Sequence, residues 1–174
     1  AVQLSGFDSL TAASSVATET KKYGYEAEHD ALNKEIADYK ALSTTPTATD
    51  AKKITDAVTA LAATLEGYDA TTPTGASKAL TDAAKAMKDA QAAGTFKPED
   101  FATALKGFSA DAALAAHNQS LDAPLEKATQ NALALKDAAS VDDVKAAIDA
   151  LNAARTGLGL ANLTTTAPTD AADV

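Results

Sequence analysis

Hydrophobic side chains recur at helical spacing in the middle of the chain. In the run ITDAVTALAATLEGY the large apolar residues alternate at steps of four and three, and they are Ile54, Val58, Leu61, Leu65 and Tyr68. This spacing places them on one face of a helix, while Ala, Thr, Gly and acidic residues fill the other positions. Such a face has to be covered, so we expect this helix to pack against others in a bundle.

Similar apolar stripes predict helices on both sides of this one, separated by Pro, Gly and Thr-rich breaks. Proline and two acidic residues at 98–100 favour the first turn of a short helix. The expected helices are 25–42, 54–68 with Asp50 as its cap, 76–93 before a stop at Gly94, a short helix from Pro98 through Phe101, Leu105 and Phe108, and 140–156.

The stretch around Pro124 allows two interpretations. Asp122 can cap a helix that has Pro124 in its first turn and runs to about residue 138, which would leave 109–119 as a separate helical piece. Alternatively, one long helix runs through the region and kinks at the proline, which lacks a backbone N–H. The pattern alone does not separate the two.

These elements define the expected fold class. A strand pattern does not compete anywhere, so we predict an all-α protein, an antiparallel up-and-down bundle of four to five main helices over residues 23–160. Residues 1–22 read as an N-terminal arm with a few apolar side chains among Ser and Thr. Residues 161–174 read as a polar C-terminal tail of low complexity.

Composition changes this picture in one respect. About a quarter of the 174 residues are alanine, and large apolar side chains are sparse. Alanine favours helices and lets them approach closely, but each alanine buries little area. We therefore expect a thin core for a chain of this length.

Charge and residue usage exclude several classes of function. The net charge is −9 and Arg155 is the single arginine, which argues against nucleic acids and anionic membrane surfaces as partners. No apolar run reaches the length of about 18 residues that a transmembrane helix needs. The chain has no cysteine, so disulfides and thiolate chemistry are excluded.

Residue usage also suggests a location. The chain is rich in Ser, Thr and Ala, nearly lacks Arg and Met, and begins at Ala1. We take these features as favouring a processed, extracellular chain, secreted or attached to the cell surface, over an artificial boundary.

Catalytic patterns are weak. Glu26 and His29 form an E-x-x-H step, which di-iron bundles use, but His117 has a leucine three residues before it, so the second step is missing. No G-x-S-x-G turn, phosphate loop or EF-hand pattern is present. We expect neither an enzyme, nor a metal site, nor a cofactor.

Apolar residues offer a better candidate. Helix faces made of alanine and a few large side chains could leave a space for a fatty chain, since pockets between bundle helices are common ligand sites. The alternative is that the same side chains are simply core. The expected ligand-binding residues are Leu61, Leu65, Tyr68, Met87, Phe101, Leu105 and Leu135.

Two runs resemble the fungal hydrophobic-surface-binding and cell-wall galactomannoprotein family. They are AVTALAATLEGYDATTPTGASKALTDAAKAMKDA and LDAPLEKATQNALALKDAASVDDVKAAIDALNAARTGLGLAN, which together cover roughly residues 52–162. About fifty residues precede the similar part, and the last helix of the family pattern is missing. The resemblance implies a secreted, non-catalytic helical protein that binds lipid or adheres to hydrophobic surfaces.

The residues and the resemblance favour one function. We expect a non-enzymatic secreted or surface protein that binds a hydrophobic ligand, a lipid or fatty acid, or a hydrophobic surface. The alternative is a structural subunit of an extracellular filament, surface layer or adhesin. In that case the N-terminal arm would mediate self-association.

Overall fold

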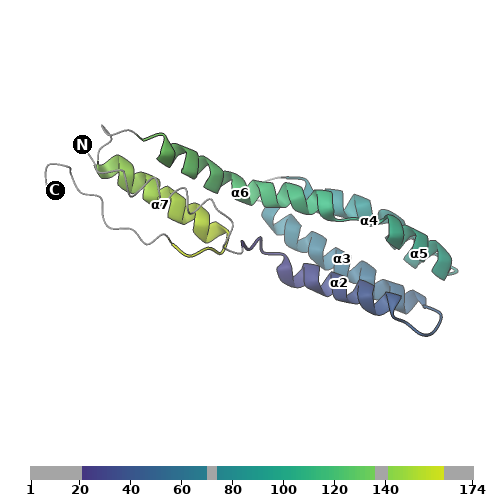
Figure 1. Ribbon diagram of the computed structural model, residues 1–174. Helices are drawn as coiled ribbons and strands as arrows, with labels where there is room; N and C mark the ends of the chain where they lie inside the picture. Colours follow the sequence, from purple (N-terminus) through teal and green to yellow (C-terminus); the bar gives the residue numbers. More distant parts are fainter. Residues whose placement is uncertain (1–20, 70–73, 136–140, 163–174) are drawn as a thin grey trace. The chain divides into compact units, whose positions relative to one another are not determined.

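The computed structural model describes residues 21–69, 74–135 and 141–162, and these ranges are helical apart from short connections (Figure 1). The all-α class is thereby confirmed, since no strand forms within the described ranges. The helices are α2 (Glu26–Lys40), α3 (Ala48–Asp69), α4 (Ala76–Ala92), α5 (Pro98–Gly107), α6 (Asp111–Leu133) and α7 (Val141–Gly157).

The start of α3 corrects the expected cap. The helix begins at Ala48, and Thr47 rather than Asp50 is the capping residue. The Asp50 backbone N–H donates to the Thr47 Oγ1 at 3.3 Å, and the Thr47 backbone N–H donates to the Asp50 carboxylate at 2.9 Å. This is a reciprocal capping box with Asp at its third position, and the Thr47 hydrogen bonds lower the pKa of Asp50.

Helix α6 resolves the ambiguity at Pro124 in favour of one long helix. It runs without interruption through the proline. Proline cannot donate the backbone hydrogen bond of its position, but the flanking turns supply enough bonds to continue the helix. Of the two interpretations, the one with separate pieces before and after Asp122 is therefore wrong.

The chain divides into two compact units, and the boundary lies inside α6. One unit, which we call the α2–α5 unit, comprises residues 24–118. The other, the α6–α7 unit, contains residues 21–23 and 119–162 of the described ranges. The predicted bundle over 23–160 spans both units, whereas the predicted arm, apart from Lys21 and Lys22, and most of the predicted tail lie outside the described residues.

Helix α3 is the centre of the α2–α5 unit. It packs against α2 on one side and α4 on the other, and α4 packs against α5 (Figure 1). Ile54, Val58, Leu61 and Leu65 are all fully buried, as their helical spacing predicts. Other buried residues of the same core include Leu32, Tyr39, Leu80, Ala84, Met87, Phe101, Leu105 and Leu114.

The connection from α3 to α4 is held by one carboxylate. Asp69 at the end of α3 accepts hydrogen bonds from the Thr74 hydroxyl at 2.7 Å and from the Ser77 backbone N–H at 3.0 Å. It thus caps the N-terminus of α4 from outside that helix. Burial by itself would raise the pKa of Asp69, but the hydrogen bonds from Thr74 and Ser77 and the nearby His117 outweigh it, so the pKa is lowered.

The α6–α7 unit has a smaller core. Its buried apolar side chains come from the second half of α6, from α7 and from the turn that follows. They are Leu125, Ala128, Ala132, Val144, Ile148, Leu151, Leu158 and Leu160.

Candidate functional site

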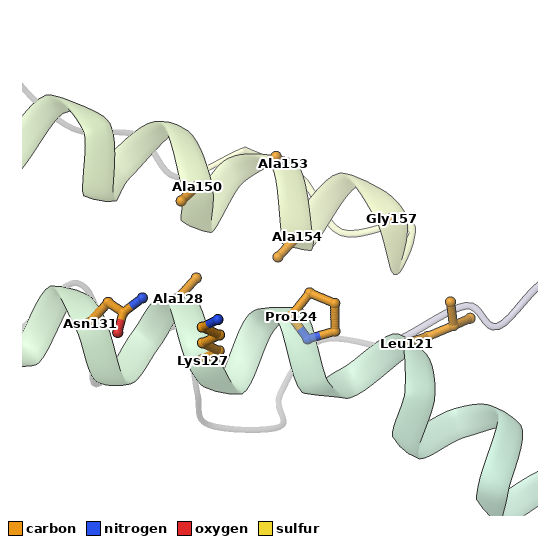
Figure 2. A pocket seen from close by; sticks show the side chains of 9 residues that line it. All are labelled: Leu121, Pro124, Lys127, Ala128, Asn131, Ala150, Ala153, Ala154 and Gly157. Carbon is orange, nitrogen blue, oxygen red and sulfur yellow. The ribbon is translucent and has the colours of Figure 1, made fainter. Parts of the chain in front are cut away.

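A groove lies between α6 and α7. Its volume is about 530 Å³, within the range of 300 to 1,000 Å³ that is usual for ligand pockets. Figure 2 shows the methyl groups of Ala150 and Ala154 on α7 facing the ring of Pro124 and the methyl group of Ala128 on α6. The lining is completed by Leu121, Lys127, Asn131, Ala153 and Gly157.

Small side chains at helical spacing create this groove. On α7, Ala150, Ala154 and Gly157 follow one another at steps of four and three, which places them on one face. The larger side chains of α7, among them Ile148 and Leu151, are buried in the core of the same unit. Because methyl groups and a glycine cannot span the distance to α6, the space between the helices stays open there.

The chemistry of the lining is apolar. Of the nine lining residues, Lys127 and Asn131 alone carry a polar side-chain group, and both side chains are exposed. None of the nine is a carboxylate, histidine, serine or threonine, and Lys127 is the one lining residue with an ionisable side chain. Apolar surface of this kind can exclude water from an aliphatic chain.

One end of the groove is fixed by the segment that precedes α2. The Lys22 backbone N–H donates to the Leu158 carbonyl at 2.7 Å, and the Tyr23 hydroxyl donates to the Asp122 carboxylate at 3.2 Å. A Cβ on Gly159, which has a φ of +69°, would meet the Lys22 side chain at 3.0 Å. The turn after α7 thus holds this segment against α6 and α7.

The structure places the seven expected ligand-binding residues elsewhere. None of them lines the groove. Leu61, Leu65, Met87 and Phe101 are 0% exposed and belong to the core of the α2–α5 unit. Their role in binding stays a prediction, and in this structure they pack against other side chains.

Of the remaining three, Tyr68 and Leu135 are partly buried and Leu105 is buried. Tyr68 is half-buried with its ring against His117, at a centroid distance of 4.7 Å. Leu105 borders a second hollow at the far end of α5. Leu135 packs against the core of the α6–α7 unit. Sequence reasoning therefore found one residue that lines a hollow, and it missed the alanine and glycine face of α7, whose steps of four and three were the available signal.

The two histidines lie in different surroundings. His117 is 1% exposed and lies between the rings of Tyr25 and Tyr68, with centroid distances of 5.5 and 4.7 Å. His29, on α2 with Glu26, lies 4.0 Å from the exposed carboxylate of Asp30. Within the described residues, no group of three or more His, Cys, Asp or Glu side chains could hold a metal ion.

The fold and the groove define a class: an all-α protein with an apolar groove between two helices. Comparison of the chain with protein-family models, with curated proteins and with solved structures finds no match. Among the described helices, none is both long enough and apolar enough to cross a membrane.

Proposed function

We propose that this chain is a non-enzymatic, secreted or cell-surface protein that binds a hydrophobic ligand, a lipid or fatty acid, in the groove between α6 and α7. The supporting observation is a volume of about 530 Å³ whose lining is apolar except for one lysine and one asparagine at the rim. The resemblance to the hydrophobic-surface-binding family agrees with this proposal.

The energy of such binding is adequate. Burial of each CH₂ group contributes about 0.8 kcal/mol, so a chain of twelve carbons gives roughly 10 kcal/mol before the costs of association. After those costs, affinity on the order of micromolar remains. An uncharged aliphatic chain is sufficient for this groove, because its lining provides shape and apolar surface rather than ion pairs.

The test is a titration of the full chain with dodecanol, followed through the backbone amide signals in NMR spectra. We expect saturable shifts at 150–157 on α7. Ala154→Leu fills the groove and should weaken binding about fivefold or more, because the added side chain takes the volume of part of the ligand. Ala146→Leu, at an exposed position of α7 outside the groove, is the matched control and should change the affinity less than twofold.

Two results would contradict the proposal. The first is an absence of shifts on α7 at saturating dodecanol. The second is an equal effect of the two substitutions, which would mean that the groove does not hold the chain. Light scattering on the same samples tests the structural alternative, because concentration-dependent assembly without any bound dodecanol would favour a subunit of a filament or surface layer.

A further inference from the structure

A second hollow lies at the end of the α2–α5 unit where α2 and α5 both terminate. Its volume is about 470 Å³, and apolar surface from Leu42, Pro46, Ala102 and Leu105 forms much of the lining. Leu42 is 38% exposed, the most exposed large apolar side chain among the described residues. The rest of the lining is Tyr39, Lys40 and Lys106.

Two lysines without ion-pair partners border this hollow. Four lysines elsewhere on the helices pair with an aspartate four residues on, as Lys34 does with Asp38 and Lys52 with Asp56, both at 2.6 Å, while others, such as Lys53 and Lys88, form no ion pair with a described residue. Lys40 and Lys106 have no such partner within the described part of the chain, and none of the seven lining residues is acidic. In a chain of net charge −9 this is a local positive site.

Helix ends do not cancel that charge. Both lysines lie in the last turn of a helix, where the backbone carbonyls carry roughly half a negative charge per helix. Two C-termini therefore contribute about one negative charge against two positive side chains. The charges of two lysine side chains therefore lie beside apolar surface, and this combination matches an amphiphile with an anionic head.

Tyr39 has a buried polar group, its hydroxyl, without a hydrogen-bond partner among the described residues. Its side chain is 8% exposed, and its buried hydroxyl makes no hydrogen bond with any described residue. The ring packs against Phe101 at a centroid distance of 5.2 Å. Burial and then the charge of Asp50 raise the pKa of Tyr39, so the hydroxyl stays a proton donor at neutral pH.

Tyr39 also lines a neighbouring hollow that is more polar. The neighbouring hollow has a volume of about 380 Å³ and contains the carboxylates of Glu35, Asp38 and Asp50. That hollow also contains Lys34 and Lys53, so its charged groups sum to −1, whereas the hollow beside Leu105 presents lysines alone as its charged groups. An anionic head is therefore directed to the side of Lys40 and Lys106.

We propose that this hollow binds a free long-chain carboxylate, with the aliphatic chain on the surface of Leu42 and Leu105 and the carboxylate between Lys40 and Lys106. Tyr39 also lines this hollow, and in this proposal its hydroxyl, which is buried in this structure, is a neutral donor to the carboxylate once the ligand is bound. The site lies within the α2–α5 unit and does not depend on the groove of the α6–α7 unit. It goes beyond the proposed function because it selects the headgroup as well as the chain.

The experiment compares dodecanoate with dodecanol on the full chain, again by amide NMR. We expect dodecanoate to shift the amides of Leu42 and Ala102 and to bind there at least fivefold more tightly than dodecanol. Substitution of both lysines, Lys40→Glu with Lys106→Glu, should lower dodecanoate affinity at these amides about tenfold, since exposed ion pairs contribute modestly one by one. Added salt should weaken the same binding.

Control variants distinguish binding at this hollow from a general effect of the net charge of the chain. Lys97→Glu changes the net charge at the other end of α5, at an exposed position, and should leave dodecanoate affinity within twofold of wild type. Tyr39→Phe removes the unpartnered hydroxyl, so folding stability should hold while dodecanoate affinity falls about threefold. Unchanged affinity in Tyr39→Phe would overturn the part assigned to the hydroxyl.

The remaining outcomes are also decisive. The inference would be overturned if dodecanol and dodecanoate bound with equal affinity, or if Lys97→Glu had the same effect as the double substitution. It would also be overturned if the chain bound phosphatidylglycerol vesicles and not free dodecanoate. Shifts confined to 150–157 would overturn it while leaving the proposed function intact. Shifts confined to Leu42 and Ala102 would support the inference and contradict the proposed function.

Discussion

Helices α3 and α7 each have a row of residues at steps of four and three, but the row is buried on α3 and lines an open groove on α7. On α3, positions at steps of four and three hold Ile54, Val58, Leu61 and Leu65, and all four side chains are fully buried. On α7, positions at the same steps hold Ala150, Ala154 and Gly157, and they line an open groove. Helical periodicity thus fixes which residues share a face, while side-chain volume decides whether that face closes against its neighbours or leaves space.

The two units differ in the same way. Both cores contain buried alanines, but the α2–α5 core also holds the large side chains of Phe101 and Met87, whereas the buried residues of the α6–α7 core are leucine, isoleucine, valine and alanine. A closed core stabilises the fold, and an unfilled helix interface offers a place for a ligand. The predictions below test this contrast, from the largest expected effect to the smallest.

The core of the α2–α5 unit should respond most strongly. Leu65→Ala should lower the free energy of unfolding by about 3 kcal/mol, because it leaves a cavity among close-packed side chains. Leu151→Ala in the α6–α7 unit, where Leu151 is also 0% exposed, should cost about 2 kcal/mol, since neighbours beside an open groove can relax. Urea unfolding followed by circular dichroism measures both. A larger loss for Leu151→Ala would contradict the contrast between the units.

Two glycines of the α2–α5 unit should respond with opposite signs. Gly24 has a φ of +85°, and a Cβ there would come within 1.9 Å of the Tyr68 hydroxyl oxygen. Gly24→Ala should therefore destabilise the protein by about 1 to 2 kcal/mol.

Gly67 is the matched control for this prediction. It lies inside α3, and a Cβ there would meet nothing within 4 Å. Gly67→Ala should stabilise the protein by about 0.5 to 1 kcal/mol, the difference in helix propensity. Thermal melts of both variants give the comparison, and equal shifts of the melting temperature would mean that neither the positive φ of Gly24 nor the Tyr68 contact opposes a side chain there.

Acid should weaken the cap between α3 and α4. The pKa of Asp69 is lower in the folded chain than in the unfolded one, so its contribution is present above about pH 4 and is lost as the pH falls through the folded pKa. Asp69→Ala should cost about 1 kcal/mol at pH 7 and less at pH 2. Urea unfolding at the two pH values measures this difference, and a cost that does not depend on pH would show that the carboxylate charge is not involved.

The smallest effect is expected in the groove itself. Ala154→Leu should change the free energy of unfolding by less than about 0.5 kcal/mol, because the added side chain enters open space. The same substitution at the fully buried Ala84 of α4 should cost about 1 to 3 kcal/mol through overpacking. Urea unfolding of the two variants is the measurement. Similar costs at the two positions would mean that α6 and α7 close the groove in solution.

The sequence by itself determined the fold class and most helix boundaries. Stripes at steps of three and four identified α3 and its buried face, and Gly94 and Pro98 marked the break between α4 and α5. These features are local: they depend on side-chain spacing, on caps and on residues that cannot continue a helix. The cap at Thr47 was missed because Asp50, three residues later, is of a residue type that caps helices equally well.

Tertiary structure decided where space remains. Leu65 and Leu105 both belong to apolar stripes and both are buried in the same core, but Leu105 also borders a hollow. The continuity of α6 through Pro124, and the division of the chain inside that helix, likewise depend on which partners each half meets. Burial and open volume are properties of several helices together, so the spacing within one helix cannot specify them.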